Sequence, residues 1–191
     1  MQGKAQAAQK LCVKAWAKVN LALDIVGRRP DGYHDIETVM HRIELADDIE
    51  VVMGGDSMTA GEPAIRVEVT GIAGMDVSGV PCGPGNIAFR AAEAFLGRLA
   101  RPRIGSKRGA GNAVSVSIRI RKRIPVGAGL GGGSADAAAV LVAMNQLWEA
   151  PFNREQLMAI GASIGADVPF CVANHGPGAS ELQGLKPVHA A

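Results

Sequence analysis

A glycine-rich run, VGAGLGGGSAD at residues 126–136, is the feature that most constrains how this chain can fold. It follows the alternating segment 114–125 and precedes residues 137–148, whose alanine content and apolar spacing are typical of a helix. Glycine permits backbone dihedrals that other residues avoid, and it lets amide groups approach a ligand closely. A helix start adds free N–H groups and the positive end of the helix dipole. The run therefore predicts an anion-binding bend, suited to the phosphates of a nucleotide.

Two better-known phosphate loops are alternatives to this interpretation. A Walker A loop ends in Gly-Lys-Ser or Gly-Lys-Thr, whereas this run ends in Gly-Gly-Ser, so that alternative fails. Gly127, Gly129 and Gly132 have the GxGxxG spacing of a dinucleotide-binding fold. In that fold, an acidic residue closes a second strand about 20 residues later. The corresponding region of this chain is predicted to be helical. A glycine turn needed only for tight packing stays open as a third alternative.

Two polar residues follow the glycines. Ser134 either offers its hydroxyl group to a bound phosphate or serves only as a helix N-cap. Asp136 suits the helix dipole, but its carboxylate would repel phosphate unless a metal ion lay between them.

Alternating and helical patterns organise the rest of the chain. In residues 11–20, Lys18 and Asn20 share one strand face, opposite Ala15 and Ala17. Further strands are predicted at 49–53, 65–69 and 114–125. Helices are predicted from Ile87 with Asn86 as N-cap, at 137–148, and from the capping box of Asn153 and Gln156 to a stop at Gly165.

Composition fits one globular domain, or two small ones, in 191 residues with 48% hydrophobic and 20% charged residues. A net charge of +2 is too weak to favour a nucleic acid or an anionic membrane as partner. Three cysteines without a CxxC pair indicate free thiols in a reducing compartment. No apolar run reaches membrane-spanning length and no signal peptide is apparent, so a cytoplasmic location is expected.

Three segments carry a family resemblance. PVGAGLGGGSADAA at 125–138 resembles the Pro-x-x-x-Gly-Leu-x-Ser-Ser-Ala signature of the GHMP kinases. AKVNLALDIVGRRPDGYHDIETV at 17–39 and GADVPF at 165–170 are similar to the substrate and catalytic segments of one branch, the 4-diphosphocytidyl-2-C-methyl-D-erythritol kinases. The resemblance implies an α+β fold, the GHMP kinase N-terminal domain, which is like the second domain of ribosomal protein S5. It also implies transfer of the ATP γ-phosphoryl group to the 2-hydroxyl of that small-molecule substrate, a step of non-mevalonate isoprenoid (terpenoid) biosynthesis.

The resemblance assigns roles residue by residue. Asp167 would be the catalytic base, and Lys18 the catalytic lysine that offsets developing negative charge. Asn20 would orient the substrate, while Tyr33 and His34 would bind its cytosine ring. Without the resemblance, Asp167, Lys18 and the Tyr33–His34 pair are better explained as solvated surface groups.

The same resemblance places a set of residues around ATP. Mg²⁺ would bridge the ATP phosphates, mostly through water and through Ser134 as its one protein ligand. Apart from the resemblance, Asn86 is explained as a helix cap and Lys122 as a strand-end charge. The ATP-binding set is Pro125, Val126, Gly127, Ala128, Gly129, Leu130, Gly131, Gly132, Gly133, Ser134, Ala135, Asn86 and Lys122.

The resemblance stops near residue 172, before the second domain that the family normally carries. The expected organisation is a flexible extension at 1–10, the ATP-binding domain at 11–172 and a truncated or irregular tail at 173–191. An incomplete cleft is expected to expose apolar surface. Two alternatives to an active kinase stay open: a nucleotide-binding fragment or degenerate kinase with little catalysis, and an S5-like nucleic-acid module, which the charge disfavours. The oligomeric state is left open.

Overall fold

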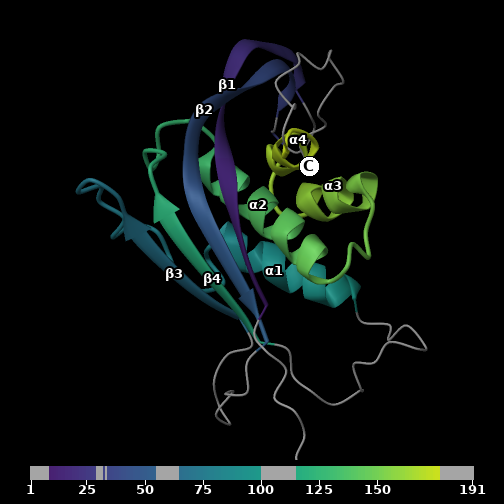
Figure 1. The fold of residues 1–191 in the computed structure, drawn as a ribbon. Helices are drawn as coiled ribbons and strands as arrows, with labels where there is room; N and C mark the ends of the chain where they lie inside the picture. Colours follow the sequence, from purple (N-terminus) through teal and green to yellow (C-terminus); the bar gives the residue numbers. More distant parts are fainter. Residues whose placement is uncertain (1–8, 29–31, 33, 55–64, 100–114, 177–191) are drawn as a thin grey trace, which may run out of the picture.

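Within the described residues, a four-stranded sheet forms one layer, and four helices cover one of its faces (Figure 1). The computed structural model describes residues 9–28, 32, 34–54, 65–99 and 115–176. The strands, in the spatial order β1-β2-β4-β3, are β1 (Gln9–Arg28), β2 (His34–Met53), β4 (Val116–Lys122) and β3 (Ile65–Gly71). The β1–β2 and β2–β4 pairs are antiparallel, and β3 pairs with β4 in parallel. This mixed, one-sided arrangement confirms the predicted α+β class.

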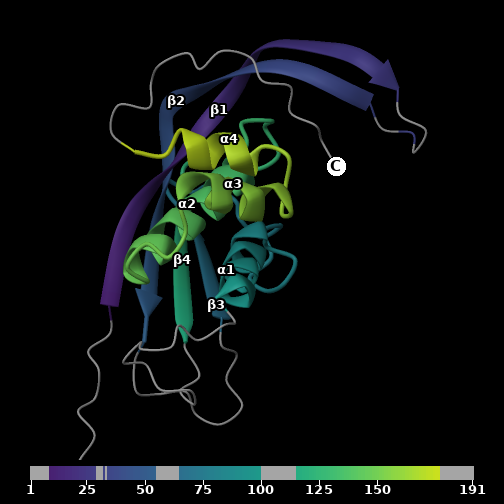
Figure 2. The ribbon, with the colours of Figure 1, turned by 90° about the vertical axis from the view of Figure 1, so that its right-hand side faces the viewer.

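The helices pack around a central one. They are α1 (Ile87–Arg98), α2 (Gly132–Leu147), α3 (Arg154–Ala162) and α4 (Val168–Ala173). Helix α2 contacts β1, β2 and each of the other three helices (Figure 2). Its run from Ala135 to Leu141 is entirely buried, because alanine side chains let the sheet and the neighbouring helices approach closely. A helix that is apolar nearly all round belongs in a core.

Period-two patterns account for the strands of the sheet. Val116, Ile118 and Ile120 are buried against the helices, as the alternation predicts. In β2, Ile49, Val51 and Met53 are buried in the same alternating way. The helix signals hold as well: Asn86 caps α1, and Asn153 with Gln156 forms a complete capping box on α3. These expectations are confirmed because each rests on local geometry.

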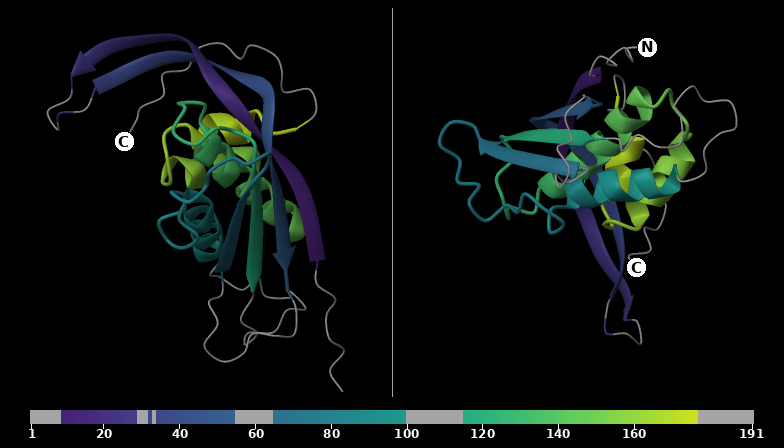
Figure 3. Two further views of the ribbon diagram at one scale, coloured as in Figure 1. Left: turned by 90° about the vertical axis from the view of Figure 1, so that its left-hand side faces the viewer. Right: turned by 90° about the horizontal axis from the view of Figure 1, so that it is seen from below.

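The first two strands are much longer than predicted. Strand β1 continues past Asn20 to Arg28, and β2 begins at His34 rather than near Ile49. Their far ends run out together beyond the helices as a two-stranded arm (Figure 3). Apolar side chains along this arm are exposed, namely Leu21, Leu23, Ile25 and Val26. The exposed apolar surface that the sequence analysis expected therefore lies on the arm.

Two further expectations need correction at the C-terminal side. Helix α3 ends at Ala162, three residues before the predicted stop at Gly165, and the short helix α4 was not predicted.

The cysteines Cys12, Cys82 and Cys171 are free thiols. Among the described helices, none combines the length and the apolar character needed to cross a bilayer.

Phe95 is the side chain on which the contact between α1 and the α2–α3 connection depends. It is fully buried, and its ring makes T-shaped contacts with those of Trp148 and Phe152, at 5.6 Å and 5.2 Å between centroids. We predict that Phe95→Ala lowers the free energy of unfolding by about 3–5 kcal/mol, because it leaves a cavity. Leu23→Ala, at a side chain 52% exposed, should change it by less than about 0.5 kcal/mol. Urea denaturation of both variants measures this, and equal losses would contradict the packing described.

Candidate functional site

The glycine bend joins β4 to α2 and presents an open backbone. Gly127, Gly129 and Gly131 have φ angles of 76°, 74° and 67°, while the intervening residues keep negative φ. Backbone whose φ alternates in sign in this way turns successive amide groups toward one side, a geometry that suits anions. Side chains added at Gly127 or Gly129 would meet nothing within 4 Å. This part of the bend is therefore free to receive a ligand.

The later glycines serve packing instead. A Cβ atom at Gly131 would lie 2.9 Å from Cγ of Lys18, and one at Gly132 would lie 3.0 Å from Cγ2 of Ile124. The run therefore combines both interpretations offered by the sequence: an open anion cradle first and a close-packed helix start second. The dinucleotide-fold alternative is excluded, because β4 is antiparallel to β2 and no parallel strand follows α2 among the described residues.

Helix α2 begins earlier than predicted, at Gly132, with Gly131 as an N-cap that has no side chain to bond the first amides. Ser134 is therefore the third helical residue, which excludes the alternative that it serves only as an N-cap. Its hydroxyl group is half-buried, and it makes no hydrogen bond within the described part of the chain. The free amides and this hydroxyl face the same helix start, where negative charge is favoured.

Lys18 lies beside the bend although it is more than 100 residues away in sequence. Its backbone N–H donates to the carbonyl oxygen of Leu130 at 3.0 Å, and its side-chain stem passes over Gly131. Its Nζ lies 3.2 Å from Oδ2 of Asp167 and donates to Oδ1 of Asn20, also at 3.2 Å. The structure thus brings together three residues that the sequence singled out, and one edge of the glycine bend.

A register shift in β1 places Lys18 there. Between Trp16 and Lys18 the pairing with β2 slips, so that Ala17 and Lys18 are both buried. The prediction that Lys18 lies on the face opposite Ala17 fails for this reason, since a bulge interrupts the period of two. The contact between Lys18 and Asn20 on one side of the strand agrees with the sequence prediction.

Asp167 occupies the position just before α4 but does not cap it with its side chain. The side chain is 29% exposed, whereas that of Lys18 is 6% exposed. The carboxylate is therefore open to solvent on one side and paired on the other. Burial, followed by the charge of Asp167, raises the pKa of the neighbouring Cys171 thiol to about 12, so this cysteine is no nucleophile.

Two residues predicted near the nucleotide have internal partners. Asn86 accepts the amide of Ala88 and donates to the carbonyl of Pro81, each at 2.8 Å, and it is 6% exposed. Lys122 is 3% exposed, and its Nζ donates to carboxylates of Asp47 and Asp136. Neither residue offers a free polar group to a ligand, so their nucleotide role stays a prediction without geometric support.

Asp136 also differs from its sequence interpretation. Its side chain is directed inward to Lys122 and is 4% exposed, so it neither faces a phosphate nor offers oxygens to a metal ion there. For the substrate pair, Tyr33 lies outside the described residues. His34 opens β2 opposite Arg28, but its side chain is not among those described.

Asp47 was missed by the sequence analysis, although a signal was present. Ile49, Val51 and Met53 face the core at intervals of two, and Asp47 is in phase with them. Lys122 is likewise in phase with the buried Val116, Ile118 and Ile120. A charged residue at an inward strand position predicts a buried partner of opposite charge.

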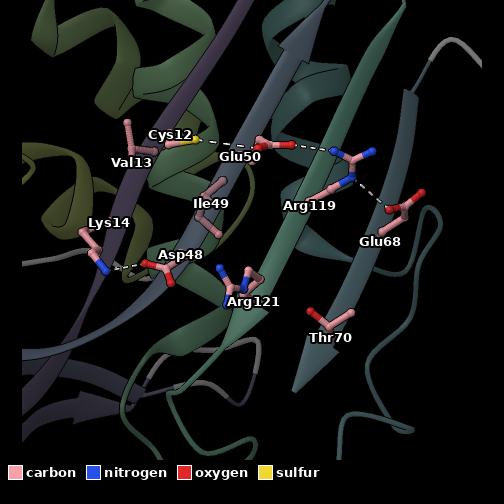
Figure 4. Close-up of a pocket in the computed structure, with 10 residues that line it drawn as sticks. All are labelled: Cys12, Val13, Lys14, Asp48, Ile49, Glu50, Glu68, Thr70, Arg119 and Arg121. Atoms are coloured by element: carbon pink, nitrogen blue, oxygen red, sulfur yellow. Dashed lines mark hydrogen bonds and ion pairs between the residues drawn. The ribbon is translucent and has the colours of Figure 1, made fainter. Parts of the chain in front are cut away.

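A hollow lies on the open face of the sheet, away from the helices (Figure 4). Its charged side chains pair with one another across neighbouring strands: Lys14 with Asp48, and Arg119 with both Glu50 and Glu68. Such solvated pairs stabilise cross-strand contacts weakly. This face has neither the glycine amides nor the Lys18–Asp167 pair, and it is not the candidate site.

Gly131 and Gly129 provide a matched test of the packing at the bend. Alanine at either position must adopt positive φ, at a cost of about 1–2 kcal/mol. Only at Gly131 does the added carbon also meet Lys18, whose stem is fixed at both ends. We predict that Gly131→Ala lowers the free energy of unfolding by about 1–3 kcal/mol more than Gly129→Ala does. Urea denaturation of both variants measures the difference, and losses of equal size would show that the stem moves freely.

The buried carboxyl of Asp136 predicts a pH dependence of stability. Burial raises its pKa well above the ordinary 3.8; Lys122 opposes this, and Asp47 adds to it. The groups that face it are Lys122 from β4, Asp47 from β2 and the thiol of Cys171 from α4. An acid whose pKa is raised by folding takes up a proton, so its contribution to stability is lost as pH rises above 3.8 toward the folded pKa.

We therefore expect the wild-type free energy of unfolding to fall more between about pH 5 and about pH 9 than that of Asp136→Asn. Asparagine keeps an oxygen for Lys122 and cannot ionise. Urea denaturation across this range measures both curves. Parallel curves would show that the Asp136 carboxyl does not take up a proton on folding in this range.

Comparison with known proteins finds relatives of this chain. The GHMP kinases N terminal domain family matches residues 86–175. The curated 4-diphosphocytidyl-2-C-methyl-D-erythritol kinase of Citrifermentans bemidjiense is 46% identical over 164 residues, which are 86% of this chain and 50% of the relative. That of Geobacter sulfurreducens is 48% identical over the same shares.

A crystal structure of 4-(cytidine 5'-diphospho)-2C-methyl-D-erythritol kinase is also similar, with 35% identity and a TM-score of 0.57. The match covers 93% of this chain and 55% of that one. The chain thus spans about half the length of the curated relatives it matches. Taken with the glycine bend and the sheet covered by helices on one face, these matches establish that the chain contains a GHMP kinase N-terminal domain.

Proposed function

We propose that this chain provides the nucleotide-binding and acceptor-activating half of an ATP-dependent kinase that acts on 4-diphosphocytidyl-2-C-methyl-D-erythritol. The observation that carries the proposal is the contact of Lys18 and Asp167 at 3.2 Å beside the glycine bend. A buried ammonium group, a partly open carboxylate and an anion cradle side by side are what phosphoryl transfer to an alcohol needs.

The polyphosphate of ATP would lie on the bend, between Pro125 and Ala135. The open amides of Val126 to Gly129 and the start of α2 supply hydrogen-bond donors and positive potential. The hydroxyl of Ser134 fits Mg²⁺ as a single protein ligand, because this ion commonly keeps several waters and binds through phosphate oxygens. Bound there, Mg²⁺ would neutralise charge on the phosphates.

The reaction then needs one proton acceptor. Asp167 accepts the proton of the substrate hydroxyl as the new O–P bond forms and the bond between the γ-phosphorus and the ADP oxygen breaks. Lys18, held between Asp167 and Asn20, offsets the negative charge that develops on the oxygens. Asn20, 3.2 Å from that ammonium group, would orient the acceptor alcohol.

The identity of the acceptor rests on the relatives, whose name states that they act on this substrate. We propose that Tyr33 and His34 bind its cytosine ring. His34 opens β2 opposite Arg28, at the end of the described part of the β1–β2 arm. We propose the domain limits as the sequence suggested them: an extension at 1–10, the ATP-binding domain at 11–172 and a tail at 173–191. We also propose that the partner is a small molecule rather than a nucleic acid or a membrane. We propose that the protein acts in the cytoplasm, where free thiols are stable.

A second candidate is a nucleotide-binding fragment with little catalysis. It is favoured by one observation, the apolar side chains that are exposed on the arm. ATP binding without turnover would support this candidate.

Asp167→Asn tests the kinase proposal. We expect the wild type to release ADP from ATP and Mg²⁺ only when the diphosphocytidyl substrate is present, and the variant to lose about 10²–10⁴-fold in turnover, because it lacks the base. ATP binding, measured by calorimetry, should change little. Asp76→Asn, at an exposed loop carboxylate, is the matched control and should keep wild-type turnover. Full turnover in Asp167→Asn would exclude the proposed base.

A further inference from the structure

Three charged side chains are buried together beneath the glycine bend. Asp47 is 0% exposed, Lys122 3% and Asp136 4%. They come from β2, from the last residue of β4 and from the first turns of α2. Burial of three ionisable groups carries a large desolvation cost, so their arrangement calls for a reason beyond stability.

Lys122 connects the two carboxylates. Its Nζ donates to Oδ2 of Asp47 and, at 2.9 Å, to Oδ2 of Asp136. The same ammonium group would lie 3.1 Å from a Cβ atom at Gly132, so it sits directly against the first residue of α2. The charge of Lys122 therefore links the strand before the bend to the helix after it.

Asp47 holds the other end of this connection. Its Oδ1 accepts the backbone N–H groups of Arg123 and of Ile124, the latter at 2.8 Å. These are the two amides between the end of β4 and Pro125, where the bend begins. They have left the sheet ladder, and Asp47 replaces the partners that the ladder no longer provides.

We propose that Asp47, Lys122 and Asp136 act as positioning residues that hold the two ends of the glycine bend at a fixed separation for polyphosphate. Asp47 fixes the exit of β4, Asp136 fixes the first turns of α2, and Lys122 joins them. The bend needs such support because Gly127 and Gly129 impose few conformational limits of their own. This inference deepens the proposed function, and its statement about nucleotide affinity rests on it.

The charge balance agrees with the geometry. One ammonium group faces two carboxyl groups, and burial raises the pKa of Asp136 while Lys122 keeps its charge. Oδ1 of Asp136 is buried without a hydrogen-bond partner, so the bond from Lys122 to Oδ2 is the one that ties this side chain to β4. Removing that bond leaves Asp47 and Lys122 as a neutral pair.

A matched pair of variants separates positioning from simple stabilisation. Asp136→Asn keeps an oxygen for Lys122, whereas Asp136→Leu has similar volume and cannot accept the bond. The leucine variant also removes the unpartnered oxygen, so its thermal stability should be at least that of the wild type. We expect it to bind ATP with Mg²⁺ about tenfold more weakly or worse. Amide hydrogen exchange in the bend should be faster in the leucine variant, and Asp136→Asn should restore both properties.

The outcomes are distinct. Wild-type affinity and exchange in a folded Asp136→Leu variant would overturn the inference. If the wild type itself binds no ATP, the proposed function fails, yet hydrogen exchange of residues 126–131 without nucleotide still decides whether the three side chains hold the bend. Should Asp136→Leu not fold, Asp47→Asn is measured with the same two readouts. It weakens the hold on Arg123 and Ile124 and should likewise speed exchange; unchanged exchange would overturn the inference.

Discussion

The hydrogen bond from the backbone of Lys18 to the carbonyl of Leu130 joins the two parts on which this molecule depends. One part is the edge strand β1, and the other is the bend between β4 and α2. This bond ties the bend to a strand that lies more than 100 residues away in sequence. With it, an ammonium group and an anion-binding backbone occupy one place, and α4 adds the carboxylate of Asp167 from the other side. Each element contributes one group, so the site exists only in the folded chain.

Local rules predicted the local features of this fold. Alternation predicted β4, Asn86 predicted the start of α1, and Asn153 with Gln156 predicted the start of α3. Each depends on contacts within a few residues, which a sequence displays directly. The same alternation also marked Asp47 and Lys122 as inward-facing, although their mutual contact depends on strand pairing that no single segment reveals.

Other features depend on tertiary structure and could not be predicted in this way. The bulge at Ala17 has no sequence signature, yet it decides which way Lys18 faces. The arm continues β1 through Leu21 to Val26, an apolar stretch without clean alternation, because both of its faces are exposed. The meeting of Lys18 with Asp167 was expected only from the family resemblance, since spacing alone says nothing about residues that lie in different layers.

The absence of a side chain at Gly131 couples the evolution of this position to that of Lys18. The lysine stem occupies the volume that any other residue at position 131 would claim. A substitution at one position therefore changes which substitutions the other can accept, and their energetic effects will not add. Divergent descendants of this sequence would be expected to change the two positions together or to keep both, even though they are far apart along the chain.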